Sequence, residues 1–281
     1  MKRLEGLCLA LLLAAGPAAA QGGAAAPAAS PAQDSAAVRQ ASLDYVEGYF
    51  TADVARMERA LHSDLEKRIV NSSGGRNTLG QMSAQTLIEI TASGGGAAAP
   101  ADQRVKEYAL LELDRDVAVT RVVSGRFVDF VQLARWNGQW KILNVLWEMA
   151  PGAVQNAERA APPDTSAILA TATDFIQGWF DSDEGRLRRA IHPELVKRAV
   201  HLRNGRSSLE HLTARRLLDA TRAGYARQIP ADRRTSQLAV LDTYGNVAMV
   251  RVRTPDEVEH LQLARWNGAW KVINVLFEER S

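Results

Sequence analysis

Four kinds of polar residue that can bind ligands or transfer protons occur twice in the chain at one constant spacing. His62 and His192 are 130 positions apart (192 − 62). The same offset relates Arg68 to Arg198, Asp129 to Glu259 and Asn144 to Asn274. An imidazole titrates near neutral pH, and a carboxylate near it can share acid and base work. These pairs are the candidate binding residues, and their use depends on the elements that position them.

The repetition extends over whole domains. Residues 133–148 read LARWNGQWKILNVLWE and residues 263–278 read LARWNGAWKVINVLFE, with 12 of 16 positions identical. The period far exceeds the roughly 20 to 50 residues of a solenoid repeat, so a complete folding unit is duplicated. We expect two domains, at residues 36–150 and 166–281, joined by a linker at residues 151–165.

Residues 1–20 have the features of a secretory signal peptide: a basic start, a short apolar run and an Ala-Ala-Ala cleavage motif. The run is shorter than the roughly 20 residues that cross a bilayer, so no membrane span is expected. We therefore expect a periplasmic or secreted protein. Residues 21–35 contain hardly a large apolar residue and are predicted to be a disordered leader. The single cysteine, Cys8, would leave with the signal peptide.

Composition and motifs exclude several classes of function. Lys and Arg (34) exceed Asp and Glu (32) by only two, which does not indicate nucleic-acid binding. The chain has no nucleophile-elbow motif, no phosphate-binding glycine loop and no dinucleotide fingerprint. One histidine lies in the first copy and four lie in the second, so the copies share no set of metal ligands. We expect neither a cofactor nor a metal.

Each copy begins with helical periodicity and ends with strand-like segments. After a first helix, a short second helix is expected with Thr51 or Asp181 as its N-cap. A third helix is expected over residues 79–92 and 209–223, each followed by a glycine. The predicted strands of the first copy are 104–113, 117–123, 127–136 and 140–149. This order predicts an α+β fold in which about three N-terminal helices pack on a curved antiparallel sheet.

Asn137-Gly138 predicts a two-residue hairpin turn, as does Asn267-Gly268 in the second copy. Uninterrupted pairing from this turn places Asp129 and Asn144 on one sheet face, directed toward the helices. Glu259 and Asn274 occupy the same places in the second copy. The opposite face, with residues such as Gln132, Phe130, Val128, Leu143, Val145 and Trp147, is too apolar to remain in water. We therefore expect the two domains to form an intramolecular pseudo-dimer, sheet against sheet.

The candidate residues allow two interpretations each. An acid and an amide on an apolar surface suit a ligand pocket, but they also suit a hydrogen-bonded structural network. His62 and His192 follow the second helix, where an imidazole either lies at the mouth of the pocket or bonds the last helical carbonyls. Arg68 and Arg198 begin a strand and either pair with the pocket carboxylate or are solvated.

These features together resemble the nuclear transport factor 2-like superfamily, which includes steroid isomerases, scytalone dehydratase and the SnoaL-like cyclases. Within it, the chain is most similar to the branch named putative lumazine-binding. The resemblance is carried by YVEGYFTADVARMERALHSDLEKR (45–68), by FIQGWFDSDEGRLRRAIHPELVKR (175–198) and by the two hairpins. It implies a conical pocket between helices and sheet, often in sheet-to-sheet dimers. Catalytic residues differ between branches, so the resemblance implies no catalytic role here. Ser63 also departs from the HPxL pattern that Pro193 keeps.

We therefore expect an exported tandem protein that binds a small organic ligand, or acts as an interaction module, without catalysis. One alternative is a dehydratase-like or isomerase-like enzyme that uses a histidine with Asp129 or Glu259 as acid and base. The other alternative is a duplication with a purely structural role.

Overall fold

The computed structural model describes residues 30–73, 76–150, 164–203 and 206–279. The expected signal peptide lies outside these residues, as do most of the expected leader and linker. The end of the leader was predicted wrongly, because the first helix begins at Pro31. Ser30 accepts a hydrogen bond from the backbone N–H of Gln33, whose side chain bonds back to Ser30. This capping box starts the helix before residue 36.

The two domains contain the same elements in the same order. The first consists of α1 (Pro31–Thr51), α2 (Val54–Ala60), β1 (Leu61–Ser73), β2 (Arg76–Ser83), α3 (Ala84–Ala92), a 3-10 turn (Ala101–Gln103), β3 (Val105–Asp114), β4 (Val117–Ser124), β5 (Phe127–Trp136) and β6 (Gln139–Met149). The second consists of α4 (Thr165–Phe180), α5 (Glu184–Ala190), β7 (Ile191–Arg203), β8 (Arg206–Thr213), α6 (Ala214–Arg222), 3-10 turns (Tyr225–Gln228 and Ala231–Arg233), β9 (Gln237–Tyr244), β10 (Val247–Arg253), β11 (Glu257–Trp266) and β12 (Ala269–Glu279).

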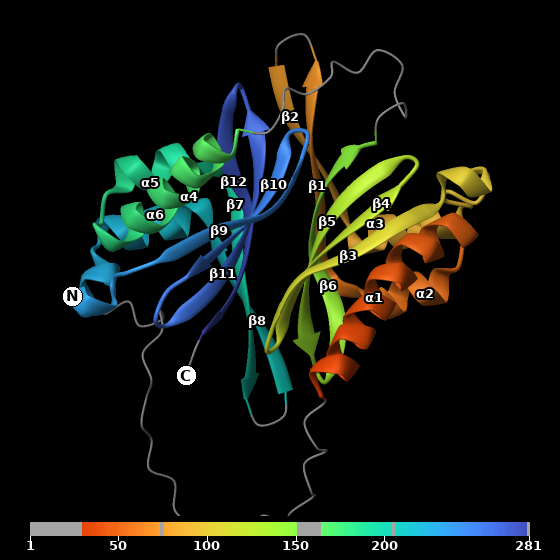
Figure 1. Cartoon of the computed structure of the whole chain (residues 1–281), viewed down its shortest axis with the longest axis horizontal. Helices are drawn as coiled ribbons and strands as arrows, with labels where there is room; N and C mark the ends of the chain where they lie inside the picture. Colours follow the sequence, from red (N-terminus) through yellow and green to blue (C-terminus); the bar gives the residue numbers. More distant parts are fainter. Residues whose placement is uncertain (1–29, 74–75, 151–163, 204–205, 280–281) are drawn as a thin grey trace, which may run out of the picture.

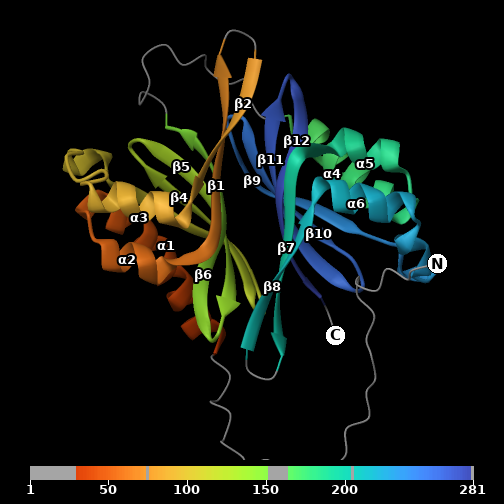
Figure 2. The same cartoon turned by 180° about the vertical axis from the view of Figure 1, so that it is seen from behind.

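Each domain is a six-stranded sheet with its three helices on one face. The strand orders are β2-β1-β6-β5-β4-β3 and β8-β7-β12-β11-β10-β9, and the first strand of each domain runs parallel to the last. In Figure 1 the sheets face each other at the centre and the helices lie on the outside. Figure 2 shows the hairpins β1-β2 and β7-β8 extending in opposite directions past the other sheet. The expected α+β class is confirmed.

Two local helix predictions were wrong. The N-caps of α2 and α5 are Asp53 and Asp183, rather than Thr51 and Asp181, and each caps with its carboxylate. The segments 79–83 and 209–213 extend β2 and β8 instead of starting a helix. The helix begins only where Ser83 or Thr213 accepts a hydrogen bond from the third residue beyond it. Strand pairing therefore overrides helical periodicity in these segments.

Both copies have a glycine at the same position of the first helix, Gly48 and Gly178, and close helix packing explains it. A Cβ at Gly178 would lie 2.7 Å from the backbone nitrogen of Leu187 in α5, and at Gly48 it would lie 3.1 Å from the Asp53 carbonyl oxygen. Only glycine lets the first helix approach the second so closely. The two helices of each domain therefore pack closely against each other.

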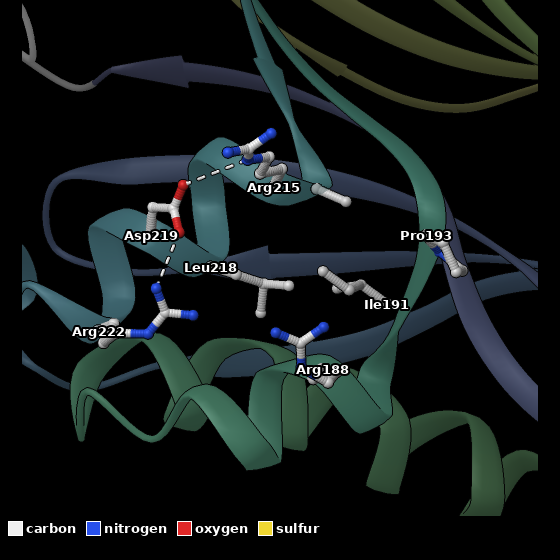
Figure 3. Close-up of a pocket in the computed structure, with 8 residues that line it drawn as sticks. Arg188, Ile191, Pro193, Arg215, Leu218, Asp219 and Arg222 are labelled. Carbon is white, nitrogen blue, oxygen red and sulfur yellow. Dashed lines mark hydrogen bonds and ion pairs between the residues drawn. The ribbon is translucent and has the colours of Figure 1, made fainter.

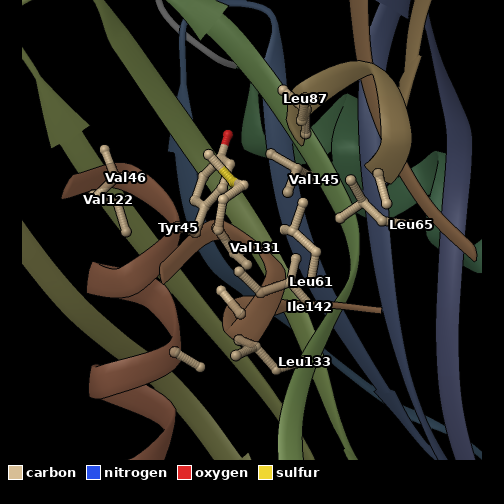
Figure 4. Close-up of a cluster of buried hydrophobic side chains, with 14 of the residues drawn as sticks. Tyr45, Val46, Leu61, Leu65, Leu87, Val122, Val131, Leu133, Ile142 and Val145 are labelled. Carbon is tan, nitrogen blue, oxygen red and sulfur yellow. The ribbon is translucent and has the colours of Figure 1, made fainter. Parts of the chain in front are cut away.

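The core of each domain fills the space between its helices and the inner sheet face. Figure 4 shows Val46 of α1 beside Val122 of β4, and Tyr45 of α1 belongs to the same cluster as Val131 and Leu133 of β5. Trp140, Ile142, Val145 and Trp147 of β6 belong to the same cluster. A cavity in this domain must therefore lie within or beside this cluster.

The hairpin register was predicted correctly only near the turn. Asn137 and Gly138 both have positive φ (48° and 82°), as the expected turn requires, and Leu133 pairs with Ile142. Beyond this point Gln132 pairs with Asn144, so Leu143 is an extra residue in a β-bulge. Every later partner shifts by one position.

The bulge reverses the faces of the residues that follow it. Asp129 remains on the helix side, where Val145 and Trp147 now lie, but Asn144 turns toward the second domain. The predicted neighbourhood of Asp129 and Asn144 is therefore wrong. Ile273 makes the same bulge in the second domain, which separates Asn274 from Glu259 in the same way.

The outer faces of the two sheets contact each other through apolar and polar groups. Two clusters contain buried side chains from both domains: Val119, Val128, Phe130, Leu146, Val247, Met249, Ala264 and Ile273 in one, and Val117, Ala134, Leu143 and Leu276 in the other. Gln132 donates to the His260 carbonyl oxygen at 2.7 Å, and Gln262 donates to the Phe130 carbonyl oxygen at 2.8 Å. The contact is thus reciprocal, as expected when two copies of one surface meet.

Two buried arginines, one from each sheet, form hydrogen bonds with the other sheet. Arg198 donates to the Leu143 carbonyl oxygen (2.9 Å) and to Asn144 Oδ1 (2.8 Å). Arg68 makes the equivalent bonds to Ile273 (3.3 Å) and Asn274 (2.9 Å). The extra residue of a bulge has no partner in the strand ladder, so its carbonyl oxygen is free to accept from the other domain.

Glu66 is paired with both of these arginines. Its carboxylate contacts Arg68 of its own strand and lies 2.9 Å from Nη2 of Arg198. The side chains of Arg68 and Arg198 are only 3% and 1% exposed. The position equivalent to Glu66 in the second domain is Val196, so Glu66 is the carboxylate that pairs with both buried cations.

Glu112 of β3 makes a further contact between the domains, and it predicts acid sensitivity. Its carboxylate lies 2.9 Å from Arg251 and 3.3 Å from both Arg253 and His260. Burial by itself would raise the pKa of Glu112, but hydrogen bonds from His260 and Arg251 outweigh burial and lower this pKa to about 2.

A folded-state pKa below the ordinary value of 4.5 means that Glu112 stabilises the fold above about pH 4.5. This contribution is lost as the pH falls from about 4.5 toward about 2. We expect the melting temperature of the parent to fall more steeply across this interval than that of Glu112→Gln. Equal slopes in differential scanning calorimetry would contradict the assignment, and the exposed Glu58→Gln serves as control.

Candidate functional site

A cavity lies between the helices and the inner sheet face in each domain, at equivalent positions. The first-domain cavity has a volume of about 140 Å³ and is lined by Tyr45, Val46, Tyr49, Lys67, Met82, Leu87, Ile90, Phe127, Asp129 and Trp147. The second-domain cavity has a volume of about 370 Å³ and contains the counterparts of all ten, from Phe175 to Phe277, along with Glu210, Tyr225, Ile229, Asp256 and Leu187. Ligand pockets usually have volumes of about 300 to 1,000 Å³, so only the second cavity reaches this range.

The first-domain cavity contains a buried lysine, Lys67, that is surrounded by an acid and aromatic rings. Lys67 Nζ donates to Tyr45 Oη and to Asp129 Oδ1, both at 2.5 Å. It also lies over the Trp147 ring, 4.6 Å from the centroid, and over Phe127 at 5.7 Å. Burial lowers the pKa of Lys67 and raises that of Tyr45, because neither ionised form is solvated. The lysine and the acid form a closed one-to-one pair.

The second-domain cavity contains the same lysine but a second acid. Lys197 Nζ lies 2.7 Å from Glu259 and 3.6 Å from Glu257, and 4.3 Å from the centroid of Phe277. Burial raises the pKa of Glu259, and Lys197 offsets this only in part while Glu257 adds to it. Burial opposes the charge of Lys197 as well, but its two acidic neighbours outweigh burial and raise its pKa.

One oxygen in this cluster lacks a partner. Glu259 Oε2 is buried and has no hydrogen-bond partner among the described residues. In the first domain Tyr45 donates a hydroxyl to Asp129 at 3.2 Å, but the equivalent residue, Phe175, has no hydroxyl. A buried acceptor without a partner costs stability, typically about 1 to 3 kcal/mol, so it is a position where a ligand can gain binding energy.

Eight of the ten equivalent lining positions differ between the cavities, and three of these differences remove the most bulk or replace a ring. Phe127, Trp147 and Ile90 of the first domain are replaced by Glu257, Phe277 and Ala220 in the second. Each replacement is smaller, or exchanges a ring for a carboxylate. The two cavities therefore differ in volume, and we call the one of about 140 Å³ the closed cavity and the one of about 370 Å³ the open cavity.

The structure divides the predicted binding residues among three environments. Asp129 and Glu259 line the cavities, as predicted. Asn144, Asn274, Arg68 and Arg198 instead lie in the contact between the sheets. Each asparagine is hydrogen-bonded there through both side-chain polar atoms, with Oδ1 accepting from an arginine and Nδ2 donating to Gln132 or Gln262. The arginines neither pair with the pocket carboxylates nor are solvated, which corrects both earlier alternatives.

The histidines also occupy a site that was not predicted. His62 lies in β1, just after α2, and its Nδ1 accepts from the backbone N–H of Asp64 at 3.0 Å. Its ring packs edge to face on Trp136 at 4.3 Å, and His192 repeats both contacts with Glu194 and Trp266. Neither imidazole lines its cavity or caps a helix. Burial lowers both pKa values, which favours the neutral ring.

Lys67 and Lys197 are the site residues that the sequence analysis missed. A usable signal was present, since the pairs Lys67-Arg68 and Lys197-Arg198 recur at the same offset. Neighbouring strand residues point to opposite faces of a sheet. The lysine therefore enters the cavity, while the arginine beside it enters the contact between the sheets.

A further hollow, of about 330 Å³, lies on the outside of the second domain. Figure 3 shows Arg188, Arg215 and Arg222 around it, with Asp219 between Arg215 and Arg222. Glu184 also pairs with Arg188 and Arg222. These arginine side chains are 59% to 92% exposed, so they form a solvated and partly neutralised surface.

The described residues contain no group of three or more His, Cys, Asp or Glu side chains arranged to hold a metal ion. Within the same residues, no helix combines the length and apolar character needed to cross a membrane.

Three helices on one face of a six-stranded sheet, present twice, match the α+β fold that the resemblance to the nuclear transport factor 2-like class implied. Residues 33–148 and 163–278 each match the model of one family, described as "Putative lumazine-binding", and the chain belongs to this family. It therefore consists of two tandem domains of this type, which confirms the expected fold class and resemblance. Comparison with curated proteins finds no match.

Several solved structures are similar to a single domain of the chain. A nuclear transport factor 2-like protein of unknown function from Silicibacter pomeroyi is 20% identical, with 43% of this chain and 100% of that one covered, at a TM-score of 0.35. One from Shewanella baltica is 20% identical, covers 44% and 100%, and has a TM-score of 0.36. A ketosteroid isomerase-like protein from Erwinia carotovora atroseptica is 15% identical, covers 41% and 95%, and has a TM-score of 0.28.

Proposed function

We propose that this is an exported binding protein whose second domain holds a small, flat organic ligand without catalysing its conversion. The observation that carries the proposal is the open cavity of about 370 Å³, which contains an unpartnered Glu259 oxygen beside Lys197. The rings of Trp179, Phe175 and Phe277 supply apolar walls. Such a cavity suits a planar ring system with hydrogen-bonding groups along its edge.

The family description supports a ligand of the lumazine type, which is a fused, nitrogen-rich ring system. Such a ring system can pack against the aromatic side chains of the cavity. The edge of the ring carries both hydrogen-bond donors and acceptors. Lys197 can donate to a ring acceptor, while Glu259 can accept from a ring N–H or donate when protonated. The alternative of a histidine paired with an acid gains no support, because His192 contacts Trp266 and does not line the cavity.

In this proposal the first domain serves as a scaffold. Its cavity of about 140 Å³ is too small for the ligand, and its sheet supports the second sheet through the reciprocal contacts of Arg68, Arg198, Gln132 and Gln262. We propose that these contacts persist in solution as an intramolecular pseudo-dimer. Small-angle scattering that showed two separated lobes would refute it. Export rests on residues 1–20, and an intact mass that retains them in the exported protein would refute this part.

Calorimetric titration with lumazine tests the proposed function. We expect one binding site per chain, because only one cavity is open. Trp179→Ala removes an aromatic wall and should weaken binding by about 1.4 kcal/mol, or roughly tenfold. Tyr49→Ala, at the equivalent position of the closed cavity, should leave the affinity unchanged. Binding that is weakened by Tyr49→Ala and unaffected by Trp179→Ala would place the ligand elsewhere.

A further inference from the structure

The open cavity contains more acids than bases, and this imbalance indicates its ligand. Lys197 is the only base among the described residues that line the cavity, whereas Glu210, Asp256, Glu257 and Glu259 are acids. Two of these acids have partners at the rim: Glu210 pairs with His201 at 2.9 Å, and Asp256 pairs with Arg233. The remaining two, Glu257 and Glu259, share the single ammonium of Lys197.

The closed cavity shows the balanced form of the same cluster. There Lys67 faces only Asp129, and Phe127 occupies the position of Glu257. The second domain thus has an additional carboxylate in place of one of the rings over the lysine. The Glu259 side chain is 3% exposed and that of Lys197 is 12% exposed, so bulk water screens this cluster poorly.

Two carboxylates beside one buried ammonium can be stabilised in two ways. They can share a proton, which is consistent with the raised pKa of Glu259, or they can bind a second cation. The unpartnered Glu259 Oε2 offers that cation a hydrogen-bond acceptor. Trp179 and Tyr225 line the same cavity, and aromatic faces attract cations.

We infer that the second-domain cavity selects organic cations, namely flat aromatic molecules that carry an ammonium or a protonated ring nitrogen, and that it disfavours carboxylated or phosphorylated ligands. The inference rests on the proposed function, since it requires the cavity to be a ligand site. It goes further by naming the charge of the ligand. A cationic nitrogen would occupy the position beside Glu257 and Glu259, with its ring between the aromatic walls.

A series of naphthalenes that share one ring system and differ in charge tests this inference. The probes are 1-naphthylmethylamine (cation), 1-naphthalenemethanol (neutral) and 1-naphthylacetate (anion), titrated by calorimetry beside lumazine. We expect the amine to bind at least about tenfold more tightly than the alcohol, and the acetate most weakly. Glu257→Gln and Glu259→Gln should each reduce the ratio of amine to alcohol affinity by several-fold. Glu58→Gln, which removes an exposed acid of the first domain, should leave the ratio unchanged.

The possible outcomes separate this inference from the proposed function. If the alcohol or lumazine binds and the amine binds no more tightly, the cation preference is wrong and the binding function stands. A cation preference that survives both glutamine variants also overturns the inference, because the charge would then be recognised elsewhere. If no probe binds and lumazine does not bind, both proposals fail. Melting curves of each variant establish that it is folded.

Discussion

Replacing Glu66 with glutamine is expected to lower the free energy of unfolding by about 3 to 5 kcal/mol, the usual effect of removing one partner from a buried ion pair. Arg68 and Arg198 would then be buried without a counterion. The Glu66 side chain is 21% exposed, which places the expected loss near the lower end of this range. The melting temperature should fall by about 2 to 4 °C for each kcal/mol.

Two controls identify the arginines as the cause. Glu58→Gln changes the net charge by the same amount at an exposed position and should shift the melting temperature by less than about 1 °C. Arg198→Met should destabilise less in the Glu66→Gln background than in the parent, because it then removes an unpaired charge. A Glu66→Gln protein that melts with the Glu58→Gln control would show that Glu66 does not stabilise the contact between the sheets.

Exchanging three residues between the cavities is expected to abolish ligand binding in the second domain. The variant Ala220→Ile, Glu257→Phe, Phe277→Trp gives the open cavity three bulky residues of the closed one, whose volume is about 140 Å³. This is less than half of the roughly 300 Å³ that a ligand pocket needs. We expect affinity for lumazine or for 1-naphthylmethylamine to fall at least about 100-fold, which corresponds to about 2.7 kcal/mol. Stability should be kept, because these residues already pack together in the first domain.

The reciprocal variant is the matched control. Ile90→Ala, Phe127→Glu, Trp147→Phe opens the first-domain cavity and gives Lys67 a second acidic neighbour. We expect a second binding site per chain in calorimetric titration, together with some loss of stability from the enlarged cavity. Undiminished binding by the closed variant would show that the ligand does not occupy the second-domain cavity.

The duplication made much of the fold predictable. The offset of 130 residues, the apolar strand-like segments between turn residues and the Asn-Gly turns indicated two α+β domains, and strands β3 to β6 were placed within one residue. The strand segments before α3 and α6 were missed. They have helical periodicity in the sequence, but β2 and β8 are stabilised by pairing with the distant β1 and β7. The periodicity of a short segment carries no information about the distant strand with which that segment pairs.

The candidate site was only partly predictable, for a physical reason. Residue types and spacing predicted Asp129 and Glu259 as pocket acids, and both side chains line the cavities; their binding of a ligand stays a prediction. The bulges at Leu143 and Ile273 could not be read from the sequence, because they form where their carbonyl oxygens accept from arginines of the other domain. That tertiary contact determined that Asn144 and Asn274 join the sheets together, whereas the alternation of neighbouring strand residues places Lys67 and Lys197 in the cavities.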